Sequence, residues 1–185
     1  MTCKTVDFTV DAAVEGLQLL QIPYNGLVSR LLSPNGDGVQ DVVAYQIDIE
    51  EAIQVDVDIY TAVSSSAVGG FEKDVLIGRA VSGLQYSTGQ YEWQWNGTEE
   101  GGAVIADGNY ILEFVVTDGC GLVERRAIPV SVDTTAPLLD IVYPKTNDLI
   151  SLIIEVTGTV IDQNPGTYQL SALETASGTS LSSIR

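Results

Sequence analysis

The chain has 185 residues, with 25 acidic side chains against 8 basic ones, which gives a net charge of −17 at pH 7. A charge of that sign repels nucleic acids and anionic membrane surfaces, and it attracts divalent cations and basic protein surfaces. Hydrophobic residues make up 45% of the chain and charged residues 18%, a balance that predicts a packed core and excludes wholesale disorder.

The residue types that are missing or rare exclude several kinds of chemistry. The sequence contains no histidine, which removes the commonest general base and the commonest transition-metal ligand. Cys3 and Cys120 fit no zinc-binding spacing, and they are open either to pairing as one disulfide or to remaining two inert thiols. No stretch approaches the roughly 20 apolar residues of a membrane span, so we expect no membrane insertion. The first residues lack the apolar core of an export signal, which we expect to lie outside this sequence or to be absent.

Nearly all periodic segments alternate with period two, which predicts β-strands. No helix start is followed by an apolar stripe. In chain order, strands are expected over 4–11, 17–22, 43–49, 53–60, 91–95, 110–116, 127–132, 139–142, 150–160 and 168–173. Clusters of Gly, Asn, Asp and Ser separate these runs, so the predicted fold class is all-β, with the strand and turn spacing of a sandwich.

Two linker-like segments divide the chain. Residues 132–137 end a strand with a proline that cannot continue a sheet ladder, and residues 8–14 resemble a worn copy of residues 129–135. About one sandwich domain separates the two. We therefore predict tandem modules, which are the tail strand of a preceding module in 1–13, one complete sandwich in 14–133, and part of a second module with a mobile end in 134–185.

Residues 33–41 carry the most specific local pattern. Their sequence, Ser-Pro-Asn-Gly-Asp-Gly-Val-Gln-Asp, places side-chain oxygens at Asn35, Asp37 and Asp41, with a glycine after each of the first two. This spacing predicts a tight loop around one calcium ion, held by those three side chains and the Val39 carbonyl.

Calcium binds roughly six to eight oxygens, so the loop needs water or a neighbouring carboxylate, for which Asp107 and Asp118 are the candidates. The structural alternative is a plain turn. In such a turn Asn35 and Asp37 hydrogen-bond their own backbone, and the two glycines take positive φ.

Two further patterns admit both a functional and a structural interpretation. Tyr91, Trp93 and Trp95 share one face of a strand and could stack on sugars, but same-face aromatics in a chain with few phenylalanines favour a core role. Glu99 and Glu100 lie side by side on a glycine-rich turn, which fixes no separation across a glycosidic bond. We therefore expect no catalysis from this pair.

Asn96-Gly97-Thr98 matches a glycosylation acceptor and also a hairpin turn, and we favour the turn. Asp56 and Asp58 alternate with apolar residues, which predicts an edge or a solvated face where charge discourages strand-to-strand aggregation. Residues 62–81 form a long connection that carries Phe71, Lys73 and Arg79 in an otherwise acidic chain. Long loops of this kind often contact partners, although a tolerated surface elaboration explains it equally well.

Four blocks, in order, resemble the FlgD-like immunoglobulin fold of bacterial surface and secreted proteins. They are the opening signature at 31–41, the strand Tyr-Glu-Trp-Gln-Trp-Asn-Gly at 91–97, the hairpin Ala-Asp-Gly-Asn-Tyr at 106–110, and the closing Val-Thr-Asp-Gly at 116–119. The resemblance covers residues 17–133. It departs at the insertion 62–81, which stands where the family has a short hairpin, and at Cys120-Gly121, where such domains end in a small residue and Asn.

Residues 133–170 resemble a second bacterial immunoglobulin-like module, of the kind that precedes YD-repeat (Rhs-type) shells in large secreted proteins. Both resemblances imply a scaffold role, since such modules space, stiffen and present other domains. Fold alone licenses no chemistry.

We therefore expect a non-catalytic spacer module of a large bacterial surface or secreted protein, whose partners are the neighbouring domains of the same polypeptide. An extracellular or cell-surface location follows from the resemblance. The first alternative is an interaction module that docks another protein through residues 62–81, for instance within a YD-repeat toxin assembly. The second is an accessory domain of a secreted hydrolase.

Overall fold

The computed structural model describes residues 18–26, 29–36, 38–65, 70–150, 153–162, 170–173 and 180–184. These residues form strands and turns, and no helix occurs among them, which confirms the prediction of an all-β fold. The chain divides into two compact units, Met1–Thr134 and Thr135–Arg185. The predicted tail strand in 1–13 lies outside the described residues.

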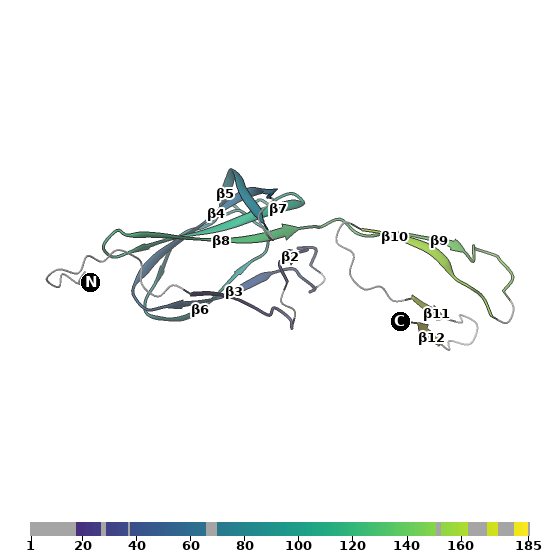
Figure 1. Ribbon diagram of the computed structural model, residues 1–185. Helices are drawn as coiled ribbons and strands as arrows, with labels where there is room; N and C mark the ends of the chain where they lie inside the picture. Colours follow the sequence, from purple (N-terminus) through teal and green to yellow (C-terminus); the bar gives the residue numbers. More distant parts are fainter. Residues whose placement is uncertain are drawn as a thin grey trace. The chain divides into compact units, whose positions relative to one another are not determined.

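The first unit is a sandwich of two sheets, which Figure 1 shows as two layers. The smaller sheet is antiparallel and has the order β1 (Gln18–Ile22), β3 (Val43–Ile49) and β6 (Gly89–Trp95). The larger sheet has the order β2 (Leu31–Leu32), β8 (Val123–Val132), β7 (Gly108–Asp118), β4 (Ile53–Ser64) and β5 (Phe71–Tyr86). All its pairings are antiparallel except that of β2 with β8, which is parallel.

The core lies between the two sheets and follows from the period-two alternation of the strands. Alternate residues of β4 (Val55, Val57, Ile59) and of β7 (Leu112, Phe114, Val116) are fully buried in one cluster with β3 and β6. Three rings join the layers: Phe114 meets Tyr45 and Trp93 edge-on, at centroid distances of 6.2 and 5.0 Å. Offset and edge-on contacts of this kind add to the burial energy of the rings.

The first unit has two poles, and the chain enters the described sandwich at one and leaves it at the other. Leu32 pairs with Val132, and Val132 pairs with Gly108, so the ends of β2 and β8 share a pole with the start of β7. Gly97, just after β6, also lies against Leu32. We call this the exit pole. β1 begins at the other end, because Gln18 pairs with Asp48 near the far end of β3.

Within residues 62–81, for which we expected a long loop, the described residues 62–64 and 71–81 belong to two paired strands instead. β4 continues to Ser64 and pairs with β5, which begins at Phe71. The pairing contains several register shifts, between Val55 and Val57, Val57 and Asp58, Ile59 and Tyr60, and Tyr60 and Ala62. Such bulges interrupt the alternation of side chains, which explains why the sequence pattern did not predict a strand there.

The second unit contains two separate hairpins. β9 (Leu138–Tyr143) pairs with β10 (Thr157–Ile161), and β11 (Leu170–Leu173) pairs with β12 (Ser180–Ile184). The strand predicted over 150–160 is wrong before Thr157, because the described residues 153–156 form no strand. β12 lies in the segment for which we predicted a mobile tail. There it pairs with β11. Leu138, Leu139 and Ile141 of β9 are exposed.

Candidate functional site

The loop at 33–41 is closed by its own backbone and by one carboxylate. The Ser33 N–H donates to the Gln40 carbonyl at 2.7 Å. The two carboxylate oxygens of Asp41 accept the N–H groups of Gly36 and Gly38, at 2.8 and 2.7 Å. Both glycines have positive φ, 83° and 84°, which suits the absence of a side chain. The described part of this loop is therefore a carboxylate-capped turn, with Asp41 as the cap.

The described members of the predicted calcium set thus have a structural role of their own. Each Asp41 oxygen already accepts a backbone N–H, as a capping carboxylate does in a turn. Asn35 and Val39 lie in the same loop, whereas Asp37 lies outside the described residues. Among the residues that the structure describes, no group of three or more acidic, Cys or His side chains could hold a metal ion. The geometry of the described loop residues therefore fits the plain turn. A calcium site would depend on Asp37.

The two carboxylates expected to complete that site lie at opposite ends of β7. Asp107 is at the exit pole, just before β7, and its Oδ1 accepts the Thr134 N–H at 2.8 Å and the Thr134 hydroxyl at 2.7 Å. Asp118 is ten residues beyond Gly108 along the strand, about 33 Å away at a strand's rise per residue. Its Oδ1 accepts the N–H groups of Cys120 and Leu122, both at 2.8 Å. Asp118 is therefore excluded as a ligand of the loop.

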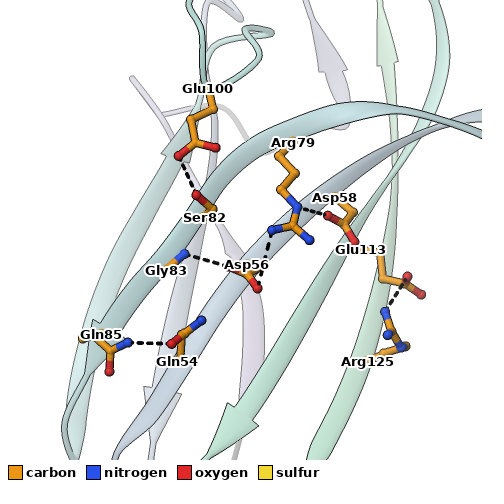
Figure 2. A network of polar contacts seen from close by, with 10 residues as sticks. All are labelled: Gln54, Asp56, Asp58, Arg79, Ser82, Gly83, Gln85, Glu100, Glu113 and Arg125. Carbon is orange, nitrogen blue, oxygen red and sulfur yellow. Dashed lines mark hydrogen bonds and ion pairs between the residues drawn. The ribbon is translucent and has the colours of Figure 1, made fainter.

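A second polar arrangement lies on the outer face of the larger sheet, as Figure 2 shows. Asp58 and Glu113 are directly opposite each other on β4 and β7. They are only 6% and 4% exposed, although both point away from the core. Two buried carboxylates side by side are unfavourable unless cations compensate them.

Three cations supply that compensation, and we call the whole set the outer-face network. Arg79 Nε donates to Asp58 Oδ1 at 2.8 Å, and Arg125 Nη1 donates to Glu113 Oε2 at 3.2 Å. Lys73 pairs with the other oxygen of Glu113 and lies 4.8 Å from the centre of the Tyr60 ring. Because Arg79 and Lys73 come from β5, the network ties that strand to β4 and β7.

This network corrects the prediction for Asp56 and Asp58. β4 lies between β7 and β5, so neither residue is on a sheet edge, and Asp58 is buried. Asp56 accepts the Gly83 N–H at 2.6 Å, and its carboxylate lies 3.8 Å from Arg79. The physical reason is the additional strand β5, which pairs with β4 in the same sheet. It carries the two cations Lys73 and Arg79. The signal in the sequence was the pair of basic residues, Lys73 and Arg79, in an acidic chain.

The aromatic face of β6 is confirmed as core. Trp93 and Trp95 are 9% and 3% exposed, so they offer no open platform for a sugar ring. Tyr91, at the margin, lies 4.7 Å from the ring of Tyr86. The Trp95 indole N–H donates to the Thr98 carbonyl at 2.8 Å, which satisfies its one polar atom inside the sandwich.

The loop after β6 folds back on the edge of β5. Gly97 takes a φ of 79°, and a Cβ there would lie 3.1 Å from the Leu32 side chain, so this turn requires glycine. The Glu100 N–H donates to the Arg79 carbonyl at 2.7 Å, and its carboxylate accepts the Ser82 hydroxyl at 2.6 Å. Glu99 lies over Gly78. The two glutamates therefore hold the loop against β5.

Cys120 is disulfide-bonded. It lies in the turn between β7 and β8, where its N–H is held by Asp118. The other cysteine of the sequence, Cys3, lies outside the described residues. Of the two alternatives left open for Cys120, the structure favours the disulfide.

Comparison of the chain with protein-family models and with curated proteins finds no match. The described residues contain no helix with the length and hydropathy needed to cross a bilayer. The fold and the geometry of these two arrangements therefore carry the functional argument.

Proposed function

We propose that residues 14–133 form a non-catalytic spacer module of a larger bacterial surface or secreted protein. The observation that carries this proposal is the pole-to-pole path of the chain through one continuous core. β1 begins at one pole, and β8 ends at the other, so the points where the chain enters and leaves the described sandwich are about one strand length apart. The outer-face network and the Asp41 turn both have structural roles. Within each of them, the polar groups bond to other groups of the same arrangement.

The proposal includes an immunoglobulin-like fold of the FlgD-like kind. Two observations support it. The Tyr110 hydroxyl, at the start of β7, donates to the carbonyl of Ala106 four residues earlier, at 2.7 Å, as the tyrosine corner of immunoglobulin-like sandwiches does. The chain also passes from the smaller sheet (β3) to the larger (β4 and β5), back (β6), and across again (β7 and β8), which is the Greek-key connection of such sandwiches.

An extracellular or cell-surface location forms part of the same proposal. The disulfide at Cys120 supports it, since disulfides persist in oxidising compartments and are rare in the cytosol. Cys3 is the partner that we propose. Peptide mapping of the non-reduced protein by mass spectrometry tests this pairing, and a Cys120 linked to another chain would contradict it.

The spacer role is tested by the rigidity of the pole-to-pole distance. Spin labels on non-natural residues at Gln18 and Ala106 would leave Cys120 untouched and would mark the two poles. Electron–electron double resonance should give one narrow distance distribution, unchanged by added salt or calcium-free buffer. A broad or bimodal distribution would show a module that bends, and the spacer proposal would then fail.

Calcium at Asn35, Asp37, Val39 and Asp41 is a second, separable part of the proposal, and its role would be structural. A thermal melt in excess EDTA and again in millimolar calcium tests it. Calcium at ten times its dissociation constant should add about 1.4 kcal/mol to the unfolding free energy, and Asp37→Ala should remove the shift. Asp118→Ala is the matched control, because that carboxylate lies at the opposite end of β7, and it should keep the calcium-dependent shift. Identical melts with and without calcium would leave a plain capped turn.

A further inference from the structure

The free edge of β5 is a surface that the spacer role does not use. β5 is the last strand of the larger sheet, so the outward N–H and C=O groups of its residues form a template for another strand. Among the described residues, one backbone bond from outside the sheet reaches this edge, from the Glu100 N–H to the Arg79 carbonyl. The stretch Phe71–Ile77 lies beyond that contact, and we call it the open edge.

The open edge is apolar at its centre. Val75, Leu76 and Ile77 follow one another and are 56%, 53% and 38% exposed. Phe71 and, on the neighbouring strand, Val63 are exposed as well. Exposed apolar residues that gather on a sheet edge mark either an aggregation hazard or a binding site.

The opposite edge of the same sheet shows how this chain protects an edge. β2 covers only Ser131 and Val132 of β8. The uncovered remainder of β8 carries Arg125, Arg126 and Pro129, and charges and proline are the usual devices against edge-to-edge pairing. The open edge of β5 has neither a charge nor a proline at Val75–Ile77, and its pairing with β4 shifts register there, between Tyr60 and Ala62.

The charges around the open edge are predominantly acidic. Glu72 and Asp74 are exposed at one end, and Glu99 and Glu100 lie at the other, against Gly78 and Arg79. The two basic residues of this stretch are already compensated, Lys73 by Glu113 and Arg79 by Asp58. A second copy of a chain with a net charge of −17 would be repelled from such an edge.

We propose that the open edge of β5 binds an extended segment of a basic partner protein by β-strand addition, with apolar residues at alternate positions flanked by Lys or Arg. Backbone hydrogen bonds supply the affinity in this mode, and the side chains supply the selection. Successive side chains of a strand point to opposite faces, so either Leu76 on one face or Val75 and Ile77 on the other meet the apolar positions. The flanking acidic residues select the basic ends. The outer-face network holds β5 in register, so the template exists before the partner arrives. This inference does not depend on the spacer role.

The test uses the full 185-residue chain and a labelled synthetic peptide, Lys-Val-Thr-Val-Lys-Val-Thr-Val-Lys. We expect fluorescence anisotropy to show saturable binding that weakens steeply with ionic strength, since exposed charges are screened by salt. The same peptide with Glu in place of Lys should not bind. Leu76→Lys should weaken binding about tenfold or more, because a charge on the edge opposes strand addition. Val123→Lys, which alters an equally exposed valine on β8, should leave binding unchanged.

Hydrogen exchange locates the peptide and keeps the test independent of the folding of the variants. Addition of the basic peptide to the unmodified chain should slow amide exchange in residues 71–77. Protection that maps to β1, β6 or β8 instead would overturn the proposal, as would equal binding of the acidic peptide. Protection of residues 71–77 without peptide, together with a dimer in sedimentation, would assign the edge to a second copy and would also overturn it.

Discussion

Two buried tyrosines show how much a single hydroxyl depends on its neighbours. The Tyr110 hydroxyl donates to the Ala106 carbonyl, whereas the buried Tyr45 hydroxyl has no hydrogen-bond partner among the described residues. A buried polar group without a hydrogen-bond partner lowers the unfolding free energy relative to a group that is hydrogen-bonded. Burial raises the pKa of Tyr45 to about 12, against a small lowering by Arg30. The two hydroxyl groups therefore have opposite effects on the unfolding free energy, although both rings lie in the same core.

For Tyr45→Phe, we expect an unfolding free energy at pH 7 equal to that of the unmodified chain or higher, because the change removes an unpartnered hydroxyl and keeps the ring. The pH dependence should differ as well. The pKa of Tyr45 is raised from 10.0 to about 12, so the folded state holds this proton more tightly than the unfolded state does. The unfolding free energy is therefore unaffected by its titration below pH 10 and falls as the pH rises from 10 through about 12. Denaturant melts across that range should show a shallower decline for Tyr45→Phe. A loss of more than about 1 kcal/mol at pH 7 would reveal a partner for the hydroxyl.

Tyr110→Phe should behave in the opposite way at neutral pH. The change removes the bond to Ala106, and we expect a loss of about 1 kcal/mol in unfolding free energy. Urea denaturation of the two variants side by side gives the comparison, with Tyr45→Phe as the matched control. No loss for Tyr110→Phe would mean that the Tyr110 contact contributes nothing to stability.

At the scale of the element, β5 separates what the sequence could predict from what it could not. The core residues of β4, β6 and β7 followed directly from alternation, as with Val57, Trp95 and Phe114, because the pairings of β4 with β7 and of β6 with β3 keep one register. β5 was missed because its bulges shift the register against β4, so apolar and polar residues do not alternate regularly. The outer-face network was missed for the same reason, since it depends on which residues of β5 lie beside Asp58 and reach across β4 to Glu113.

The outer-face network should give Arg79 a larger effect than other surface arginines. Arg79→Met leaves Asp58 buried without its hydrogen-bonded cation, and we expect a loss of about 2 kcal/mol in unfolding free energy. Arg126→Met is the matched control, because its ion pair with Glu124 is more exposed and such pairs contribute about 0–1 kcal/mol. Chemical denaturation measures both. Similar losses for the two variants would show that the buried carboxylates do not need Arg79.

At the scale of the whole molecule, the two units differ in how much they bury. The first unit encloses its core between two sheets, whereas the described strands β9 and β10 of the second unit pair only with each other and expose Leu139 and Ile141. The sequence predicted the division near residue 134 from the proline and the fresh set of strands. It could not predict which parts of 150–160 form a strand, because Ile-Ser-Leu-Ile-Ile-Glu-Val at 150–156 shows no regular alternation.

The two units should therefore behave differently when separated. Residues 1–134 alone should melt in one cooperative transition close to the main transition of the full chain. Residues 135–185 alone should show no cooperative transition, because an isolated two-stranded hairpin is marginal in water. Calorimetry of the two fragments and the full chain measures this. A sharp transition in the 135–185 fragment would show that its hairpins form a core of their own.

The parallel pairing of β2 with β8 has a consequence for force. The two bonds that join these strands at the exit pole run from the Ser131 N–H to the Arg30 carbonyl and from the Asp133 N–H to the Leu32 carbonyl, both at 2.9 Å. Tension between the two ends of the chain pulls Arg30 toward the N-terminus and Asp133 toward the C-terminus. Because β2 and β8 are parallel, this force acts along the two strands in opposite directions. It therefore shears both bonds at once instead of peeling them one after the other. A strand of only two residues thus acts as a lock against lengthwise extension, and it would open easily only when pulled sideways.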